Sequence, residues 1–385
     1  MKKVLILILL GLVSLSMGFG FFLYGNFQKI SVQPNTQDRD SALTPAHTPV
    51  DSFNNALPYA FILLGYGGGA HEGGKLTDSM MVVHIWPEKK SITLISLPRD
   101  LWVSLPLTPE QNSSWKINAA YANGADDRSY RFKPARYTGE AGGGELAKYA
   151  VNQVTGLEID NFVALNFHGF KRSVNVLGGV NVNVEKTFDD FLYPIEGKET
   201  DPCGKTDEEL KALATVSASI AEKELPCRYE QLHFDRGRTL MSGETALKYV
   251  RSRHSAQDGT DFGRAARQRN LLLAVKERVF SLDFFPKVLP FISSLSNDLT
   301  TDLTLADMQM FLRYKDELRG FSIHSFALTE DNALMLSRSA NGQSILVAKD
   351  GVGNWQGVHE WVSTQLVAPI TEPAASASAS PSPSL

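Results

Sequence analysis

The feature that most restricts this chain is an apolar run near its N-terminus. Residues 4–24 carry no charged side chain, and Lys2 and Lys3 come directly before them. At a rise of about 1.5 Å per residue, a helix over this run spans about 31 Å, which matches a bilayer core about 30 Å thick. Lysines on one flank keep that flank in the cytoplasm. We therefore expect one transmembrane helix that acts as an uncleaved signal-anchor, with the chain after about residue 30 outside the cell.

A cleaved signal peptide is the alternative interpretation of the same run. Such a peptide has a shorter apolar core and small residues at its cleavage site. Here the far end of the run carries bulky aromatic residues instead, at Phe19, Phe21, Phe22 and Tyr24. These residues favour the anchor, and cleavage after residues 16–18 is the alternative.

Composition divides the chain into four parts. Residues 1–30 hold the cytoplasmic stub and the anchor. Residues 31–57 are rich in Pro, Thr, Asp and Ser, which is typical of a flexible spacer. Residues 58–368 carry the apolar runs of a folded domain. Residues 369–385 consist mainly of Ala, Ser and Pro, and we expect this tail to be disordered.

Strand-like and helix-like patterns alternate within the domain. Short runs rich in apolar, β-branched and aromatic residues predict strands over 59–64, 80–86, 91–97, 162–167 and 180–184. Helical spacing and capping residues predict helices over 144–154, 169–177, 244–250, 265–280 and 305–318. This alternation predicts an α/β fold, a layered α-β-α domain with a central mixed sheet, preceded by the transmembrane helix.

The two cysteines, Cys203 and Cys227, do not form a CxxC pair, so neither a zinc motif nor a redox motif is supported. A disulfide becomes possible outside the cytoplasm. It would close a loop of about 25 residues and stabilise the fold by roughly 3–4 kcal/mol in the chain-entropy model. Two separate thiols are the alternative. The polar loop between the cysteines has little else to hold it, which favours the bridge.

Arginines are concentrated in one short stretch. The formal net charge of −4 gives the whole molecule no attraction to nucleic acid, so an anion site must come from local clustering. Five arginines lie between positions 251 and 269, and a helix beginning near Gly263 places Arg264, Arg267 and Gln268 near one another. Guanidinium groups hold phosphate oxygens in pairs, so the stretch indicates a phosphate or pyrophosphate ligand. The alternative is a charged helix face offset by nearby acids.

A second charged cluster lies at the ends of two predicted strands. Arg99 and Asp100 follow one strand directly, and Asp78 precedes the other. Ligand sites in α/β sheets favour strand ends, and the alternative is a solvated Arg99 paired with Asp100. A pyrophosphate normally travels with Mg²⁺, which takes one or two carboxylates together with phosphate oxygens and waters. Asp78 is therefore the expected metal ligand, and capping a turn is its alternative role.

Several short strings along the domain form an ordered set. They are Ile62-Leu63-Leu64-Gly65, Thr77-Asp78-Ser79-Met80-Met81, Ser96-Leu97-Pro98-Arg99-Asp100, Lys116-Ile117-Asn118-Ala119-Ala120-Tyr121, Leu177-Gly178-Gly179-Val180, Ser242-Gly243-Glu244-Thr245-Ala246-Leu247-Lys248-Tyr249, Arg251-Ser252-Arg253, Asp261-Phe262-Gly263-Arg264 and Arg267-Gln268. Each string is weak alone, but their number, order and spacing are specific. Together they resemble the LytR-CpsA-Psr family over residues 60–277, with weaker likeness beyond.

The resemblance implies an enzyme of the cell wall. Family members look like single-pass type II proteins of the cell membrane with an extracellular catalytic domain, which agrees with the expected anchor. By this resemblance the chain is a phosphotransferase. It moves a phosphate-linked glycopolymer from a polyprenyl pyrophosphate carrier to a hydroxyl of peptidoglycan, and the lipid tail lies in an apolar tunnel between sheet and helices. Its expected partners are these two substrates and the membrane, not nucleic acid.

The resemblance also implies roles for single residues. Asp78 would help to hold Mg²⁺ (or Mn²⁺), and Asp261 would support the arginines. For the proposed phosphotransfer, Asp261 is also our candidate to orient or deprotonate the attacking hydroxyl. Arg99 and Arg264 would act in catalysis as well as in binding. The residues expected to bind the pyrophosphate are Arg99, Arg251, Arg253, Arg264, Arg267 and Gln268.

The chain departs from the family pattern after its first predicted strand. Many members carry an acid there, whereas this chain has Tyr66 followed by glycines up to Gly69. This departure puts the second metal carboxylate in doubt. Glu72 or His71 is the candidate substitute, and a site with one carboxylate is the alternative.

Two other functions are possible for a chain with these features. A non-catalytic module that binds the wall or a lipid pyrophosphate would keep the basic cleft without needing Asp78 or a metal. A transcription regulator is disfavoured, because no helix-turn-helix is evident and the domain is expected outside the membrane. The phosphotransferase accounts for the most features.

The expected topology can be tested with a protease that cannot enter cells. Lysines before the apolar run place the domain outside, so protease added to intact, wall-stripped cells should digest it, as followed by immunoblotting. Full protection of the domain would contradict this topology.

Overall fold

A computed structural model of the chain describes residues 25, 27–35, 53, 55–69, 73–213, 222–255, 257, 259, 261–279, 295 and 297–367. Among these residues, the central sheet has the strand order β11-β6-β1-β2-β3-β12. Two neighbouring pairs are parallel and three are antiparallel, so the sheet is mixed, as predicted. Its strands are β1 (Tyr59–Tyr66), β2 (Thr77–Trp86), β3 (Ser91–Leu97), β6 (Asn161–Asn166), β11 (Leu299–Thr301) and β12 (Ser322–Ala327).

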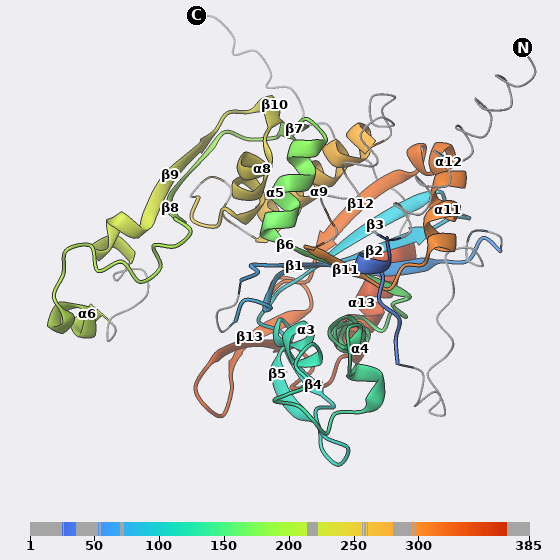
Figure 1. Ribbon diagram of the computed structural model, residues 1–385, viewed down its shortest axis with the longest axis horizontal. Helices are drawn as coiled ribbons and strands as arrows, with labels where there is room; N and C mark the ends of the chain where they lie inside the picture. Colours follow the sequence, from blue (N-terminus) through green and yellow to red (C-terminus); the bar gives the residue numbers. More distant parts are fainter. Residues whose placement is uncertain are drawn as a thin grey trace, which may run out of the picture.

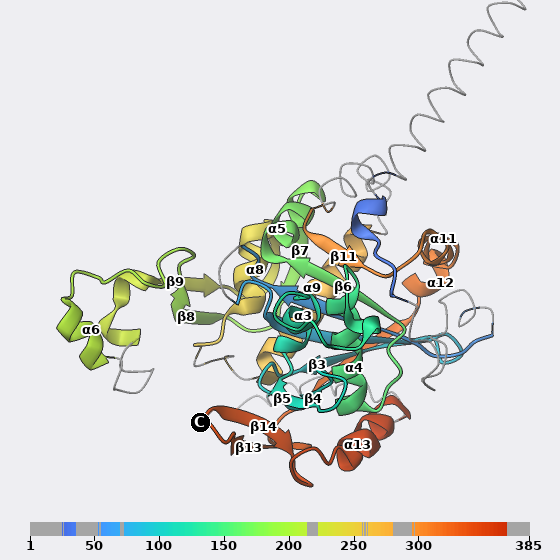
Figure 2. The same cartoon turned by 60° about the horizontal axis from the view of Figure 1, so that its bottom comes forward.

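Helices cover both faces of the sheet and give the predicted α-β-α layers (Figure 1, Figure 2). One face buries Ile62 and Val82 in a core with α4, and the other carries Leu63 and Met81 toward α9 and α11. The first layer holds α3 (Ala119–Gly124), α4 (Gly142–Thr155) and α13 (Gln356–Val367). The second holds α5 (Phe167–Val176), α8 (Gly243–Arg251), α9 (Asp261–Val279), α11 (Leu305–Arg313) and α12 (Lys315–Arg319).

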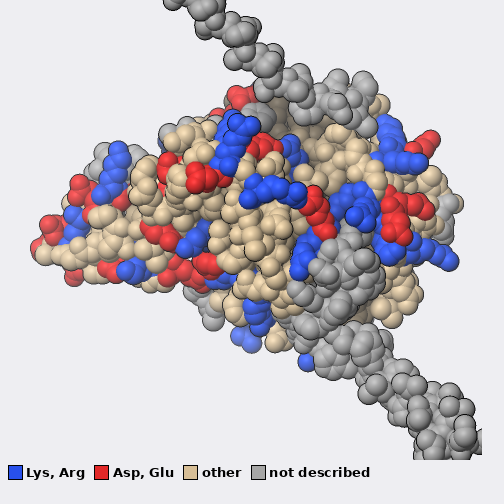
Figure 3. Space-filling view, turned by 90° about the horizontal axis from the view of Figure 1, so that it is seen from above, with Lys and Arg blue, Asp and Glu red and all other residues tan. Residues whose placement is uncertain are grey.

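Four strand pairs outside the central sheet complete the described part of the chain. They are β4 (Trp102–Leu105) with β5 (Ser113–Lys116), β7 (Val180–Val184) with β10 (Gly237–Met241), β8 (Phe188–Pro194) with β9 (Tyr229–Phe234), and β13 (Leu334–Arg338) with β14 (Ser344–Ala348). β8 and β9 lead into an arm that carries α6 (Asp207–Leu213) and projects from the body (Figure 1). Basic and acidic side chains are interspersed along this arm (Figure 3).

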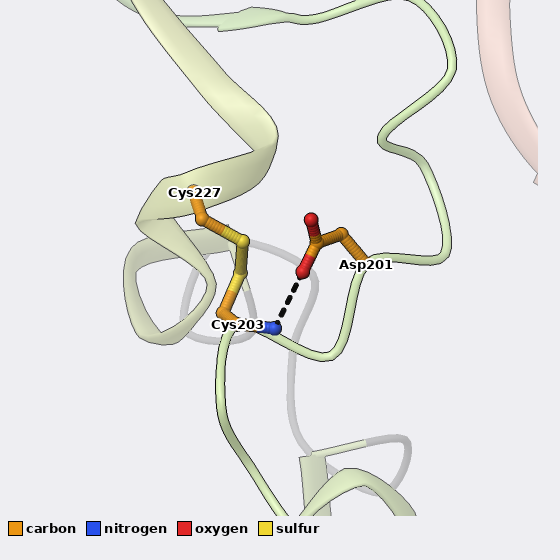
Figure 4. Close-up of side chains that lie close together, drawn as sticks. All are labelled: Asp201, Cys203 and Cys227. Carbon is orange, nitrogen blue, oxygen red and sulfur yellow. Dashed lines mark hydrogen bonds between the residues drawn. A yellow bond between two sulfur atoms is a disulfide. The ribbon is translucent and has the colours of Figure 1, made fainter.

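A disulfide closes the arm near its tip. Cys203 and Cys227 are bonded, with their Cα atoms 5.5 Å apart, which confirms the predicted bridge (Figure 4). The Asp201 carboxylate lies beside them and accepts a hydrogen bond of 2.9 Å from the Cys203 N–H. Because the disulfide uses both sulfur atoms, this group is a structural staple rather than a metal site.

Local signals explain where several elements begin and end. α4 ends at Gly156, whose φ of 70° lies in the left-handed region that glycine adopts without strain. Ser242 precedes α8 and accepts a hydrogen bond of 3.2 Å from the Thr245 N–H. The helix predicted over 305–318 is in fact two helices. The chain leaves helical geometry at Tyr314, whose ring packs 4.9 Å from that of Phe53.

The first described residues of the chain are held by the edge of the sheet. Ile30 and Val32 are buried, and the Val32 N–H donates a hydrogen bond of 2.8 Å to Thr301 O on β11. The start of the predicted spacer is therefore packed against the domain. None of the described helices combines the length and apolarity that crossing a membrane requires, and the predicted anchor over residues 4–24 lies outside the described residues.

Gly144 tests the packing of the α4 layer on the sheet. A Cβ at this position would lie 2.1 Å from Cε1 of Phe162, whose side chain is fully buried in β6. Gly144→Ala should therefore destabilise the protein by about 1–3 kcal/mol, measured by urea unfolding, because an overpacked core must shift. Gly320→Ala is the control, since its Cβ would meet nothing closer than 3.4 Å. Equal stability of both variants would contradict this account.

Candidate active site

A cavity of about 530 Å³ lies between the sheet and the layer of α5, α8 and α9. Most of its wall is apolar, and one end is polar, where Asp78 and several arginines line it. A smaller cavity of about 110 Å³ adjoins that polar end. The apolar lining includes Leu63, Met81, Val163, Leu165, Phe170, Val174, Leu247, Leu271 and Val275.

Arg99 lies where β3 ends, between two carboxylates. Its Nη1 donates a hydrogen bond of 2.7 Å to Asp78 Oδ1, at the start of β2. Its Nε lies 3.7 Å from Asp100 Oδ2. Since β2 and β3 are antiparallel neighbours, the start of one and the end of the other meet at the same edge. The antiparallel pairing of these two predicted strands therefore brings the charged side chains together.

Arg251, Arg253 and Arg264 reach the same point from the end of α8, the segment after it and the start of α9. Arg251 is the last residue of α8, and Arg264 lies in the first turn of α9. All three line the large cavity, and Arg253 and Arg264 also line the small one. The structure therefore brings together all four arginines for which a pyrophosphate clamp was predicted.

The arginines are close enough to affect one another. Burial, and then the guanidinium groups of Arg264 and Arg99, lower the pKa of Arg253 from its usual value to about 10. Among the described residues, the Arg253 side chain has no carboxylate in contact with it. A bound anion would oppose this repulsion, so the polar end of the cavity is suited to a phosphate group.

Within the described part of the chain, Arg251 is held by aromatic rings and pairs with no acid. Its guanidinium carbon lies 4.3 Å from the ring centroid of Phe167 and 5.8 Å from that of Tyr193. Its Nη1 also donates a hydrogen bond of 3.3 Å to the Tyr193 hydroxyl. A cation over ring faces is stabilised without being neutralised, so Arg251 keeps its charge for a ligand.

Asp190, on β8, fixes the segment that carries Arg251 and Arg253. Its carboxylate is fully buried and accepts hydrogen bonds from the Ser252 hydroxyl at 2.7 Å and from the backbone N–H groups of Arg253 and His254. Burial alone would raise the pKa of Asp190, but these bonds and one from the Leu192 N–H hold it below its usual value.

Gln268 and Arg267, the two remaining predicted ligands of the pyrophosphate, differ in position: only Gln268 lines the cavities. Gln268 lines both cavities; it donates to Ser79 Oγ at 3.4 Å and accepts from Ser96 Oγ at 3.3 Å, which ties α9 to β2 and β3. Arg267 is buried, donates to the Ser252 carbonyl at 2.6 Å and lies 4.9 Å from the ring centroid of Phe188. Arg267 is not among the described residues that line either cavity, so it supports the arginine segment from behind.

Two predicted acids cannot be placed in the site. Glu72, the tentative second metal ligand, lies outside the described residues, as does His71. Asp261 is the first residue of α9, but its side chain is outside the description as well. Asp78 is the one described carboxylate that lines both cavities.

This arrangement can be compared with known proteins. A sequence model described as the LytR_cpsA_psr family matches residues 22–352. The chain belongs to the LytR_cpsA_psr family.

Characterised members of the LytR_cpsA_psr family are distant in sequence. The polyisoprenyl-teichoic acid–peptidoglycan teichoic acid transferase TagU of Enterococcus faecalis is 27% identical over 67% of this chain and 66% of its own length. Biofilm regulatory protein A of Streptococcus mutans is 27% identical over 72% of this chain and 58% of its own length. TagV of Bacillus subtilis, which carries the same transferase name as TagU, is 25% identical over 80% of this chain and 65% of its own length. The match therefore spans less than two thirds of the length of each relative.

Solved structures share the LytR_cpsA_psr fold. Protein gbs0355 of Streptococcus agalactiae superposes with a TM-score of 0.55 at 23% identity, covering 85% of this chain and 93% of that one. TagV of B. subtilis superposes with a TM-score of 0.51 at 24% identity, covering 80% of this chain and 97% of TagV. TagT bound to LI-WTA superposes with a TM-score of 0.50 at 20% identity, covering 86% of this chain and 96% of TagT.

Several residues of the site carry no signal in the sequence. Asp190, Tyr193 and Phe167 lie far along the chain from the arginines that they hold. Lys116 belongs to one of the family strings, and its Nζ lies 2.6 Å from Asp100 Oδ1. A spacing pattern does not identify such partners, because only the folded sheet and helices bring them together.

Asp190→Asn tests whether the buried carboxylate holds the arginine segment. The amide would turn a donor toward groups that already donate, and an unsatisfied buried group costs about 1–3 kcal/mol. Because the folded pKa of Asp190 lies below its unfolded value, its charge stabilises the fold fully above about pH 4, and this part is lost as the pH falls through the folded pKa. The stability gap between wild type and variant should therefore narrow below about pH 4 in thermal melts.

Asp189→Asn is the control for this measurement. Asp189 is the neighbouring residue, and its carboxylate pairs with the exposed His233 at 2.7 Å. A surface pair of this kind should contribute less than about 1 kcal/mol. If Asp189→Asn lost as much stability as Asp190→Asn, Asp190 would have no special role in holding the arginine segment.

Proposed function

We propose that this protein transfers a phosphate-linked glycopolymer from a polyprenyl pyrophosphate carrier to a hydroxyl of cell wall peptidoglycan. The observation that carries the proposal is the cavity: four arginines at one end of an apolar space of about 530 Å³. Family membership supports it, since relatives carry the name of polyisoprenyl-teichoic acid–peptidoglycan transferases. In this proposal the anchor over residues 4–24 holds a single-pass protein in the cell membrane, with the domain outside.

The two ends of the cavity suit the two ends of such a donor. An apolar wall favours a hydrocarbon chain, at about 0.8 kcal/mol for each buried CH₂ group. The arginines at the other end favour a diphosphate, whose paired oxygens match the guanidinium fork. A soluble nucleotide would fill the charged end and leave the apolar wall exposed, so a lipid-linked diphosphate is the better fit.

The polar end also offers a ligand for Mg²⁺. In phosphoryl sites Mg²⁺ uses one or two carboxylates and takes its other ligands from phosphate and water. The Asp78 carboxylate at the junction of the cavities meets this minimum, so the residues present fit the ion. Bound there, Mg²⁺ would neutralise charge on the diphosphate oxygens.

Phosphoryl transfer needs positioning and charge neutralisation more than covalent help. In our proposal Arg99 and Arg264 hold the phosphate that is attacked, and Arg251 and Arg253 hold the phosphate that leaves with the lipid. Their positive charges stabilise the transition state most where negative charge develops on the phosphate oxygens during the reaction. The site can therefore act by placing fixed charges around one phosphorus atom.

Alanine variants of the arginines test the clamp. Hydrogen bonds to charged groups are worth about 1.5–3 kcal/mol each, so losing one arginine should slow transfer at least about tenfold, at roughly 1.36 kcal/mol per decade. Arg99→Lys and Arg264→Lys should also fail, because an ammonium keeps the charge but loses the fork. The measurement is transfer of a lipid-linked oligosaccharide to wall fragments by each purified variant.

Arg131→Ala is the matched control, because Arg131 is exposed and hydrogen-bonds only within its own loop among the described residues. Thermal melting should show that each variant is folded. Full activity of both Arg99→Ala and Arg264→Ala would refute the clamp. Tight binding of the donor by the wild type, with no transfer at all, would instead favour a non-catalytic binding module.

A further inference from the structure

The small polar cavity lies on the far side of the arginines from the apolar cavity. The residues that line both cavities are Asp78, Ser79, Arg99, Arg253, Arg264 and Gln268. Beyond these, the large cavity runs along β1, β6 and β11, whereas the small one is lined from the ends of β3 and β12 and from β14. In the sheet order β11-β6-β1-β2-β3-β12, β2 with Asp78 stands between the two.

This order matters for a transfer reaction. The attacking and leaving oxygens of a phosphoryl transfer lie roughly in line, on opposite sides of the phosphorus. With the lipid in the large cavity, as the proposed function requires, the lipid phosphate leaves toward β1 and β6. The nucleophile then comes from the side of β3 and β12, where the small cavity lies.

Asp100 is one of the residues that line the small cavity. Lys116 holds its Oδ1 at 2.6 Å, and the backbone carbonyl of Asp100 accepts a hydrogen bond of 2.9 Å from the Leu346 N–H. Its Oδ2 lies 3.7 Å from Arg99 Nε, beyond hydrogen-bonding distance. Among the described residues no hydrogen bond is donated to this oxygen, so a carboxylate that Lys116 holds through Oδ1 keeps Oδ2 as an acceptor for a ligand.

We propose that the small cavity is the acceptor subsite and that Asp100 holds the sugar hydroxyl that attacks. This inference rests on the proposed function. A volume of about 110 Å³ has room for several waters, and hence for the hydroxyl-bearing edge of a sugar ring rather than for a lipid chain. Sequence reasoning gave the task of orienting the hydroxyl to Asp261; Asp100 is the acid that lines this cavity beside Asp78.

The step balances as follows at the phosphorus nearest the polymer. The acceptor oxygen forms a new P–O bond, and the bond from this phosphorus to the bridging oxygen breaks. The bridging oxygen keeps the electron pair and leaves as polyprenyl phosphate. The hydroxyl proton passes to Asp100 Oδ2 and then to solvent, to which the side chain is 38% exposed. An aspartate accepts the hydroxyl proton in the same way in protein kinases.

Asp100→Asn in the full-length protein tests this role. The amide keeps the shape and can still meet the hydroxyl, but it cannot take the proton. Transfer of a lipid-linked oligosaccharide to wall fragments should fall about a hundredfold, within the usual range for a general base. The KM for wall fragments should rise, while binding of the donor, measured by calorimetry without acceptor, should stay within about twofold of wild type.

Glu277→Gln is the matched control, because Glu277 is an exposed acid that pairs with Arg238 at 2.8 Å, outside both cavities. It should leave transfer and donor binding unchanged. Wild-type transfer by Asp100→Asn would overturn the inference and leave the proposed function standing. A loss of donor binding parallel to the loss of transfer would also overturn the inference, because Asp100 would then act only through Arg99. Wild-type protein that binds the donor and transfers nothing would overturn both.

Discussion

Four guanidinium groups, those of Arg99, Arg251, Arg253 and Arg264, share one end of a cavity, and the fold has to hold them there against mutual repulsion. At an effective dielectric constant of about 20, two unit charges about 6 Å apart repel by roughly 3 kcal/mol. The fold supports three of them in different ways: an ion pair with Asp78 for Arg99, ring faces for Arg251, and backbone bonds to Asp190 for the segment around Arg253. Burial, and then the charges of Arg264 and Arg99, lower the pKa of Arg253, and a bound diphosphate would oppose both effects.

The apolar part of the cavity imposes a second cost. Protein cores are packed to crystal-like density, and side chains that face an open space lose dispersion contacts there. Leu63, Met81 and Val174 face such a space although they lie between sheet and helices. A hydrocarbon chain would complete this core, so the ligand that binds the arginines would also supply the missing contacts. The two halves of the site are therefore linked through a single ligand with a charged head and an apolar tail.

Local patterns predicted much of this fold, because the signals for a hairpin or a capped helix lie within the segment itself. The β-rich apolar runs of β2 and β3 and the caps at Gly156 and Ser242 are of this kind. The break at Tyr314 was missed; its ring packs on that of Phe53, a contact between residues far apart in the chain. β8 and β9 were missed as well, in a polar segment without clear alternation.

The arginine cluster could be predicted for a different reason, namely that charge density in a short stretch is visible without a structure. What the sequence does not reveal is the division of labour within the cluster. Arg264 and Arg267 are three residues apart on α9 and look equivalent, yet one lines both cavities and the other is buried over Phe188. α9 packs against β7 as well as against β12 of the central sheet, so different sides of the helix meet different surroundings.

The position of Arg99 between Asp78 and Asp100 affects how any substitution there should be interpreted. Its Nη1 donates to Asp78, which lines both cavities. Its Nε lies near Asp100, which lines only the small cavity. Removing Arg99 would therefore remove a phosphate contact and, at the same time, free two acids beside an anionic ligand. Energies of residues that touch do not add, so the loss belongs to the group of three rather than to the arginine. A double-mutant cycle between Arg99 and Asp100 separates the two parts, because only the coupled part depends on the carboxylate.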